Sequence, residues 1–328
     1  MLLAGDVGGT KTLLGLFEPD AQRPAARVVR SYPTASFAHF TDLLDAFAAD
    51  VSAPAALDAV VIGVAGPVVG NRAVLTNVGL EIAADDAGAR FRTRRARLLN
   101  DLEAMASAIE VLTPDELLRL QEGIPIDGGA RAVIAAGTGL GQAYLHRVNG
   151  SWRAVATEAG HADFAARTDR ELELVRMLRD RYGRAEVEQV LSGPGLVNLH
   201  RFAHRGGECQ IVTDLDSPDA PALVSQAGLG GRCQGCAEAL QMFVSAYGAE
   251  AGNLALRTMA TAGVYVGGGI ARKILPAITA GGFMEAFRNK APLTELVSKV
   301  PVHVILNDEA GLVGAAVRAQ QLGREVRS

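Results

Sequence analysis

Two segments of this 328-residue chain repeat one plan: an apolar strand, a glycine-rich turn, a second strand and a later helix. The first begins near Asp6 and the second near Ala135. Strands that alternate with helices predict an α/β protein. We interpret the repeat as two related halves that face each other across a cleft, and this length is more typical of two domains than of one. The alternative is one continuous, doubly wound sheet.

Apolar runs and helical spacing predict the individual elements. In the first half we expect strands at 2–4, 13–17, 27–32, 59–64 and 96–99, and helices at 37–49 (with Ser36 as N-cap) and 102–109. In the second half we expect strands at 132–136, 142–148, 263–266 and 302–306, and helices at 169–182, 186–204, 235–260 and 311–322. The polar stretch 205–221 is expected to be an irregular surface excursion.

Composition and charge exclude several classes of protein. The net charge is −4, and the arginines gathered between 90 and 97 are interpreted as a solvated helix end and strand entry, so no nucleic-acid partner is expected. No apolar stretch reaches about 18 residues, which argues against a membrane span. Met1 leads directly to Asp6 without a signal-peptide pattern, and three cysteines make no disulfide framework. A cytoplasmic location is therefore expected.

The first glycine-rich turn has the chemistry of a phosphate site. Backbone N–H groups bind phosphate without ordering side chains, and glycine lets an anion approach the backbone closely. The Asp6 carboxylate adds an oxygen ligand suited to a hydrated Mg²⁺. The alternative is a hairpin tip whose glycines serve only positive φ angles. The residues expected to bind the nucleotide here are Asp6, Gly8, Gly9, Thr10 and Lys11.

Two further glycine turns follow apolar strands. They match neither the dinucleotide fingerprint nor the P-loop pattern. The third turn would let a flat nucleotide lie against the backbone, although a plain strand-to-helix turn is the alternative. Three such turns together favour a nucleotide-binding protein. The residues expected to contribute are Gly137, Thr138 and Gly139 in the second turn, and Gly267, Gly268 and Gly269 in the third.

The order and spacing of the motifs, from residue 2 to about 316, resemble bacterial glucokinase, most closely the enterobacterial type, within the hexokinase and actin-like ATPase superfamily. The motifs that carry the resemblance are Asp6-x-Gly-Gly-Thr-Lys-Thr12, Asn100-Asp101, Gly137-Thr-Gly-Leu-Gly141, Glu158-Ala-Gly-His161, Leu191-Ser-Gly-Pro-Gly-Leu-Val-Asn198 and Gly267-Gly-Gly269.

The resemblance implies a two-domain actin-like ATPase (ribonuclease H-like) fold with a central cleft. A small α/β domain would span 1–110 and take back a C-terminal helix segment at 301–328, and a large α+β domain would span 111–300. The implied function is ATP-dependent phosphorylation of glucose to glucose 6-phosphate, with Mg²⁺, in a homodimer. A kinase for another hexose or an N-acetylhexosamine is the first alternative. A non-catalytic sugar-sensing protein is the second, although the phosphate turn at Asp6 leaves no room for a preceding DNA-binding domain.

The same resemblance assigns roles to polar residues. Asp101 would be the general base on the sugar 6-hydroxyl, because a carboxylate is the usual acceptor for this proton. The alternative from spacing alone is that Asn100 or Asp101 caps the following helix. Ala159 replaces a glycine often found in the family. The sugar-binding residues implied are Asn100, Asp101, Glu158, His161 and Glu188, with Glu186 rejected as a near neighbour.

The cysteines raise the question of a metal. Cys233 and Cys236 have a metal-like spacing, and Cys209, His200 and His204 are further candidate ligands. Because the cysteine pair opens a predicted helix, we expect ordinary buried or surface thiols and no metal ligands.

Overall fold

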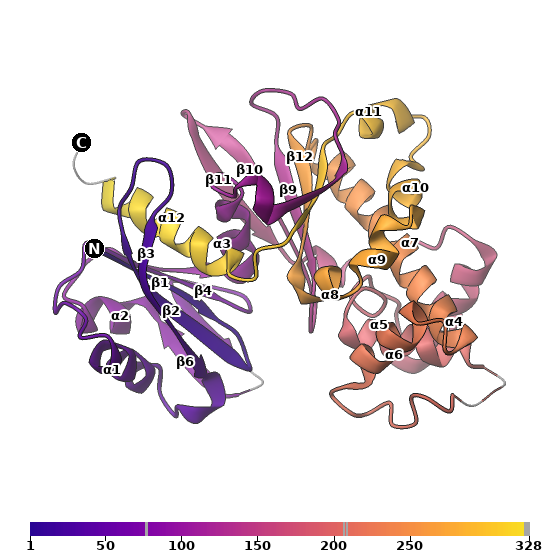
Figure 1. The fold of residues 1–328 in the computed structure, drawn as a ribbon, viewed down its shortest axis with the longest axis horizontal. Coiled ribbons are helices and arrows are strands. Elements are labelled where there is room, and N and C mark those ends of the chain that lie inside the picture. The colour runs from indigo at the N-terminus through magenta and orange to yellow at the C-terminus, as the bar shows by residue number, and fades with distance from the viewer. Residues whose placement is uncertain (76–77, 206, 208, 325–328) are drawn as a thin grey trace. The chain divides into compact units, whose positions relative to one another are not determined.

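The computed structural model of the protein describes residues 1–75, 78–205, 207 and 209–324. The chain divides into two compact units (Figure 1). The first contains Met1–Glu116, Val148–Ala156 and the chain from Asn307 onward. The second contains Leu117–Arg147 and Thr157–Leu306. Each unit is therefore assembled from stretches that are distant in sequence.

The first unit is built on a five-stranded sheet with the strand order β3-β2-β1-β4-β7. β1 and β2 form an antiparallel hairpin, whereas β4 and β7 run parallel to β1. All five strands expected in this half are confirmed. Their bounds are β1 Leu2–Val7, β2 Lys11–Glu18, β3 Ala25–Pro33, β4 Ala59–Val64 and β7 Ala96–Asn100.

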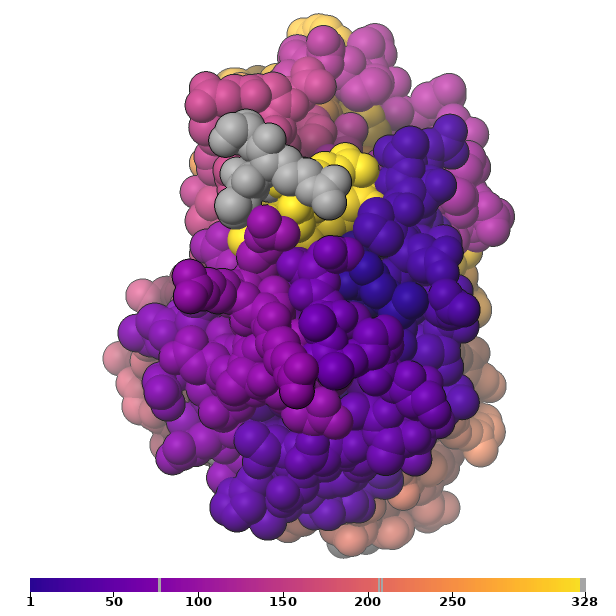
Figure 2. Space-filling view, turned by 90° about the vertical axis from the view of Figure 1, so that its left-hand side faces the viewer, coloured from indigo at the N-terminus to yellow at the C-terminus, as the bar shows by residue number. Residues whose placement is uncertain are grey.

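Side chains of β1 alternate between two apolar layers, as expected for a strand buried on both faces. Leu2 and Ala4 pack with helices α3 (Asp101–Ala108) and α12 (Ala310–Arg324). Leu3 and Val7 pack with α1 (Phe40–Asp50), α2 (Ala84–Arg90) and a small hairpin, β5 (Arg72–Leu75) and β6 (Leu80–Ala83). Figure 2 shows the outer surface of the first unit from one side. On the side turned toward the viewer, most of this surface consists of N-terminal residues, in indigo and purple, and yellow α12 is visible beside them.

The second unit is built on a six-stranded sheet with the order β11-β10-β9-β12-β13-β8. Because this sheet is separate from the first, the alternative of one continuous sheet is wrong. The strands are β8 Leu117–Gln121, β9 Arg131–Ala136, β10 Leu140–Val148, β11 Ser151–Thr157, β12 Gly263–Gly267 and β13 Val302–Ile305. The helices are α4 Asp169–Tyr182, α5 Gly193–Ala203, α6 Ala220–Leu229, α7 Gln234–Thr258, α8 Gly268–Lys273, α9 Leu275–Thr279, α10 Gly282–Arg288 and α11 Thr294–Ser298.

Two predicted helix starts are wrong. Ser36 belongs to a short 3₁₀ turn, Thr34–Ser36, and α1 begins at Phe40 after His39. The helix expected from 186 begins only at Gly193, because Ser192 caps it and a proline occupies its first turn. Helical spacing of apolar residues continued upstream of both true starts and hid them.

Helix α7 is the longest described, yet no helix in the described ranges is both long and apolar enough to cross a membrane.

Helices α3 and α12 approach each other through their backbones. An ideal Cβ placed on Gly314 of α12 would lie 1.7 Å from the carbonyl oxygen of Ala104 in α3. Only glycine fits there, because a methyl group would force the helices apart. This contact sets the distance at which α3 lies over the sheet.

We expect Gly314→Ala to lower the free energy of unfolding by about 2 kcal/mol, because overpacking against a backbone carbonyl cannot be relieved by a side-chain rotation. Urea unfolding followed by circular dichroism measures the change. Gly323→Ala is the matched control on the same helix, where the new Cβ would lie 3.9 Å from Leu2 and improve helix propensity. Equal stability of the two variants would contradict the packing argument.

Candidate functional site

The carboxyl ends of β1, β4 and β7 are aligned in the first unit. Val7 pairs with Val64, and Val64 pairs with Asn100. Loops that follow parallel strands gather at this edge of a sheet, which is where α/β proteins bind ligands. The turn after Asp6 and the Asn100-Asp101 pair therefore lie at one edge, as the sequence interpretation requires.

The hairpin tip after β1 is held by hydrogen bonds to a neighbouring segment. The Gly8 amide donates to the Lys11 carbonyl at 3.0 Å, which leaves Gly9-Thr10 as the tip. The buried Thr34 hydroxyl donates to the Gly8 carbonyl at 2.7 Å and lies 2.9 Å from the Thr12 hydroxyl. Gly8 does not adopt a positive φ angle. The hypothesis that this glycine serves only a left-handed turn is therefore wrong.

The Asp6 carboxyl group lies under the start of α12. An ideal Cβ on Gly311 would lie 2.8 Å from its Oδ2 atom, so glycine makes room for the carboxylate. Burial raises the pKa of Asp6 from 3.8 to about 6, and the nearby Lys11 ammonium opposes this rise. Asp6 is still mostly ionised at neutral pH. A largely buried carboxylate oxygen fits a hydrated Mg²⁺ in chemical type.

Asn100 and Asp101 lie at the start of α3. Asn100 Oδ1 accepts a hydrogen bond from the Leu102 amide at 2.9 Å, and its Nδ2 donates to the Gly66 carbonyl at 3.1 Å. Asp101 Oδ1 also accepts from the Leu102 amide at 2.9 Å. The helix-cap alternative is thus confirmed for Asn100. Capping does not exclude ligand binding, because an amide side chain has further donor and acceptor capacity.

In the second unit, the turn after β9 begins with Gly137, whose backbone conformation does not require glycine. The Gly137 amide donates to the Gly139 carbonyl, and the Gly137 carbonyl accepts from the Gly193 amide, both at 2.8 Å. No atom lies within 4 Å of an ideal Cβ on Gly137, and its φ angle is not positive. Thr138 at the tip is exposed. The open space beside Gly137 is what close approach by a ligand would require.

The third glycine turn lies beside the second. Gly267 at the end of β12 pairs with Ala135 at the end of β9. Gly268 has a φ angle of +85°, and an ideal Cβ there would lie 2.5 Å from the Ala136 carbonyl oxygen. Gly269, by contrast, faces open space. A glycine at 268 is therefore required by structure, whereas packing gives no reason for the one at 269.

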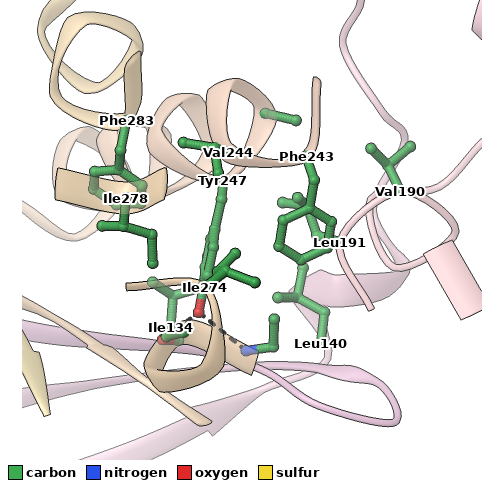
Figure 3. Close-up of a cluster of buried hydrophobic side chains, with 14 of the residues drawn as sticks. Ile134, Leu140, Val190, Leu191, Phe243, Val244, Tyr247, Ile274, Ile278 and Phe283 are labelled. Carbon is green, nitrogen blue, oxygen red and sulfur yellow. Dashed lines mark hydrogen bonds between the residues drawn. The ribbon is translucent and has the colours of Figure 1, made fainter. Parts of the chain in front are cut away.

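The buried hydroxyl group of Tyr247 forms hydrogen bonds with the backbone just before both of these turns. The Tyr247 hydroxyl accepts a hydrogen bond from the Ala136 amide at 3.0 Å and lies 3.3 Å from the carbonyls of Ile134 and Gly267 (Figure 3). Tyr247 is fully buried in α7, and burial raises its pKa. The neutral hydroxyl thus fixes the ends of β9 and β12 relative to each other.

Glu188 binds the glycine turn directly. Its Oε2 atom accepts a hydrogen bond from the Leu140 amide at 2.7 Å, and an ideal Cβ on Gly139 would lie 2.6 Å from the same oxygen. The Leu140 carbonyl lies against Gly160, where a Cβ would come within 2.2 Å of its oxygen. Glu188 lies in a turn, so the alternative of a surface helix is wrong.

Glu186 also lies close to Glu188 and His161. His161 Nδ1 lies 3.5 Å from Glu186 Oε1, and His161, Glu186 and Glu188 offer polar atoms within 4.8 Å of one another. The sequence interpretation rejected Glu186, and nothing in the spacing distinguishes it from Glu188. Glu158 is exposed at the start of the 3₁₀ turn Ala159–His161.

Sequence reasoning missed the supporting residues Thr34, Tyr247 and Gly311. Each acts through a contact with a residue distant in sequence, and no local motif marks it. The one available signal is a glycine or tyrosine inside an otherwise apolar helix, which is too common to be specific.

Comparisons with known proteins agree with the motif order. A family model described as Glucokinase matches residues 3–322. A glucokinase from Nostoc sp. is 35% identical to this chain, covering 98% of this chain and 99% of its own length.

Solved structures agree as well. The structure of a glucokinase from an Antarctic psychrotroph has a TM-score of 0.86 and 27% identity, covering 98% of each chain. A ROK-family glucokinase from Streptomyces griseus, in complex with glucose and AMPPNP, has a TM-score of 0.65 and 21% identity, covering 98% of this chain and 99% of its own. These matches confirm the expected α/β actin-like ATPase fold.

The raised pKa of Asp6 predicts a pH-dependent gain in stability for Asp6→Asn. The folded protein binds this proton more tightly than the unfolded chain, so wild-type stability falls as pH rises from about 4 through about 6. We expect the variant to be more stable by about 1–3 kcal/mol at pH 8, and by less at pH 5.

Urea unfolding at both pH values, in the presence of a chelator, tests this expectation. The exposed Asp127 supplies the control variant Asp127→Asn, which should show no such difference. A variant gain that is the same at pH 5 and pH 8 would exclude the titration of Asp6 as its cause.

Proposed function

This chain belongs to the glucokinase family, and we propose that it transfers the γ-phosphoryl group of ATP to the 6-hydroxyl group of glucose. The observation that carries the proposal is the register of β1, β4 and β7, which gathers the Asp6 turn and Asp101 at one sheet edge. The complex of the Streptomyces griseus relative with glucose and AMPPNP, an ATP analogue, supports the choice of both substrates.

Asp101 accepts the proton of the sugar hydroxyl in this proposal. Phosphoryl transfer needs alignment, charge neutralisation and a proton acceptor, and the hydroxyl becomes acidic only as the new bond forms. The position of Asp101 in the first turn of α3, with Oδ1 bound to the Leu102 amide, holds the carboxylate in one orientation. A fixed acceptor avoids the cost of ordering a side chain during the reaction.

Each unit carries polar side chains that are candidates for binding the sugar. Asn100, held by the Gly66 carbonyl, offers both a donor and an acceptor. His161 and Glu188 offer an imidazole and a carboxylate from adjacent segments of the second unit, and Glu158 is the further candidate. Several such contacts reject sugars with a missing or inverted hydroxyl, because buried polar groups would stay unpaired.

The glycine turns bind the nucleotide. In the first unit, the backbone amides after β1 are the proposed phosphate donors. In the second unit, the amides after β9 have the same role, and the open backbone at Gly269 is the proposed surface for the rest of the nucleotide. Asp6 would hold a hydrated Mg²⁺, and the ion, when bound, neutralises charge on the phosphate oxygens. The chain's own contribution is to position the phosphates and the Asp6 carboxylate, which is still mostly ionised at neutral pH.

A kinase for another hexose or for an N-acetylhexosamine remains the second candidate, favoured by the additional carboxylate of Glu186 beside His161. Turnover over a panel of sugars, with ATP and Mg²⁺, decides between them. From the resemblance we also propose a cytoplasmic homodimer, and light scattering of the purified protein tests the dimer.

We expect Asp101→Asn to lower kcat by about 10²–10⁴-fold, because the amide cannot accept the proton while its oxygen can still cap α3. Glucose affinity, measured by calorimetry, should stay within about tenfold of wild type because ground-state hydrogen bonds are retained. Asp115→Asn, on an exposed 3₁₀ turn, is the control. Wild-type kcat in Asp101→Asn would remove Asp101 from the role of base.

We expect Gly137→Ala to raise the KM for ATP by about tenfold or more, because the new methyl group would occupy the space proposed for a phosphate group. The melting temperature should stay unchanged, because the methyl group contacts no described atom of the protein. The control is Gly282→Ala, another position with nothing within 4 Å. Steady-state kinetics with varied ATP and varied glucose separate the two substrates. An unchanged KM for ATP would show that this turn does not contact the nucleotide.

A further inference from the structure

His200, His204, Cys209 and Cys236 gather at one place in the second unit. The third cysteine of the chain, Cys233, contacts both His204 and Cys209, and the proposed function uses none of these residues. His200 lies in the last turn of α5, and His204 is its C-cap residue. Cys209 follows in the loop, Cys233 is the N-cap residue of α7, and Cys236 lies in the first turn of α7. Three chain segments thus bring five soft ligand atoms together.

The distances between these atoms match the edges of a tetrahedron around a zinc ion. Zinc–sulfur bonds of about 2.3 Å place two sulfur ligands about 3.8 Å apart, and sulfur and nitrogen ligands about 3.5 Å apart. Cys209 Sγ lies 3.8 Å from Cys233 Sγ and 3.9 Å from Cys236 Sγ. His204 Nε2 lies 3.2 Å from Cys233 Sγ. The sulfur atoms are therefore spaced as ligands of one ion.

The orientation of His204 also suits a metal ligand. Its Nδ1 atom lies 2.9 Å from the His200 carbonyl oxygen, so Nδ1 carries the proton and donates it to that carbonyl. Nε2 then has its lone pair directed toward the sulfur atoms. A histidine that donates one ring N–H to a backbone carbonyl while the other nitrogen binds metal is a common arrangement.

Two further features point to a ligand. His200 is 2% exposed, and neither of its ring nitrogens has a hydrogen-bond partner among the described residues, which is costly for a buried imidazole. Gly235, between the two helix cysteines, makes room for the His204 ring, because an ideal Cβ there would lie 2.7 Å from Nε2. His200 offers a ring nitrogen within 4.8 Å of the ligand atoms of His204, Cys209 and Cys236, so a metal ion there would lie beside the unpaired ring.

We propose that Cys209, Cys233, Cys236 and His204 bind one structural Zn²⁺, with His200 packed against the site as the alternative nitrogen ligand. Thiolates and imidazole select zinc over Mg²⁺ or Ca²⁺. On binding, each cysteine thiol releases its proton to solvent, and no electrons are transferred. The sequence expectation of ordinary thiols at Cys233 and Cys236 is thereby replaced.

The ion joins the end of α5, the loop after it and the start of α7. α5 begins at Gly193, whose amide binds the Gly137 carbonyl, and α7 carries Tyr247. The zinc therefore stabilises the two helices whose other parts hold the second and third glycine turns. It does not contact substrate, and its role is structural.

The wild-type protein alone tests the proposal. We expect purified protein, dialysed against metal-free buffer, to retain about one zinc per chain by elemental analysis. Titration with a mercurial reagent should release that zinc to a chromogenic chelator as the thiols react. Substitution with Co²⁺ should give thiolate charge-transfer and tetrahedral d–d absorption. Metal-free protein with reactive thiols, or a disulfide found by mass spectrometry, would overturn the proposal.

Matched variants locate the ligands. We expect Cys236→Ser and His204→Asn to lose most of the bound zinc and to show a lower melting temperature that added zinc no longer raises. His39→Asn, at the exposed N-cap position of α1, should keep full zinc. Zinc content is measured without turnover, so failure here leaves the proposed kinase activity untouched. Full zinc in both ligand variants would contradict the assignment.

Discussion

The hydrogen bonds of the Tyr247 hydroxyl fix the part of the second unit on which its candidate site depends. The group lies in a fully buried core and binds backbone atoms at the ends of β9 and β12. Both glycine turns start there, so this side chain of α7 supports the spacing that the pairing of β9 with β12 sets. An unsatisfied hydroxyl in this core would cost more than the hydrogen bonds contribute, which makes the arrangement specific.

Glycine serves two different purposes in this chain. At Gly268 and Gly314 an added Cβ would collide with a backbone carbonyl, so glycine is needed for packing. At Gly137 and Gly269 an added Cβ would meet nothing, so packing gives no reason for glycine. The second group is where a bound ligand would account for the residue type.

A structural role and a proposed functional role coincide at Asn100. The sequence left helix capping and sugar binding as alternatives, whereas the structure gives the cap to the Oδ1 atom and leaves the amide with capacity for more. The cap also directs the chain so that Asp101 stands in the first turn of α3. A rigid helix start is thus a means of holding the proposed base in place.

The sequence by itself determined the five strands of the first sheet, four strands of the second, the family and the positions of the glycine turns, because these depend on local periodicity and on short motifs. It also indicated the helices α1, α3, α4, α5, α7 and α12, but not the shorter helices or the strands β5, β6, β8 and β11. It could not determine the start of α5, the approach of Glu186 to His161, or the support from Thr34 and Tyr247. The gathering of Cys209 with Cys233, Cys236 and two histidines was likewise decided by tertiary structure. Such contacts join residues far apart in sequence, and their geometry exists only once the helices and sheets have packed.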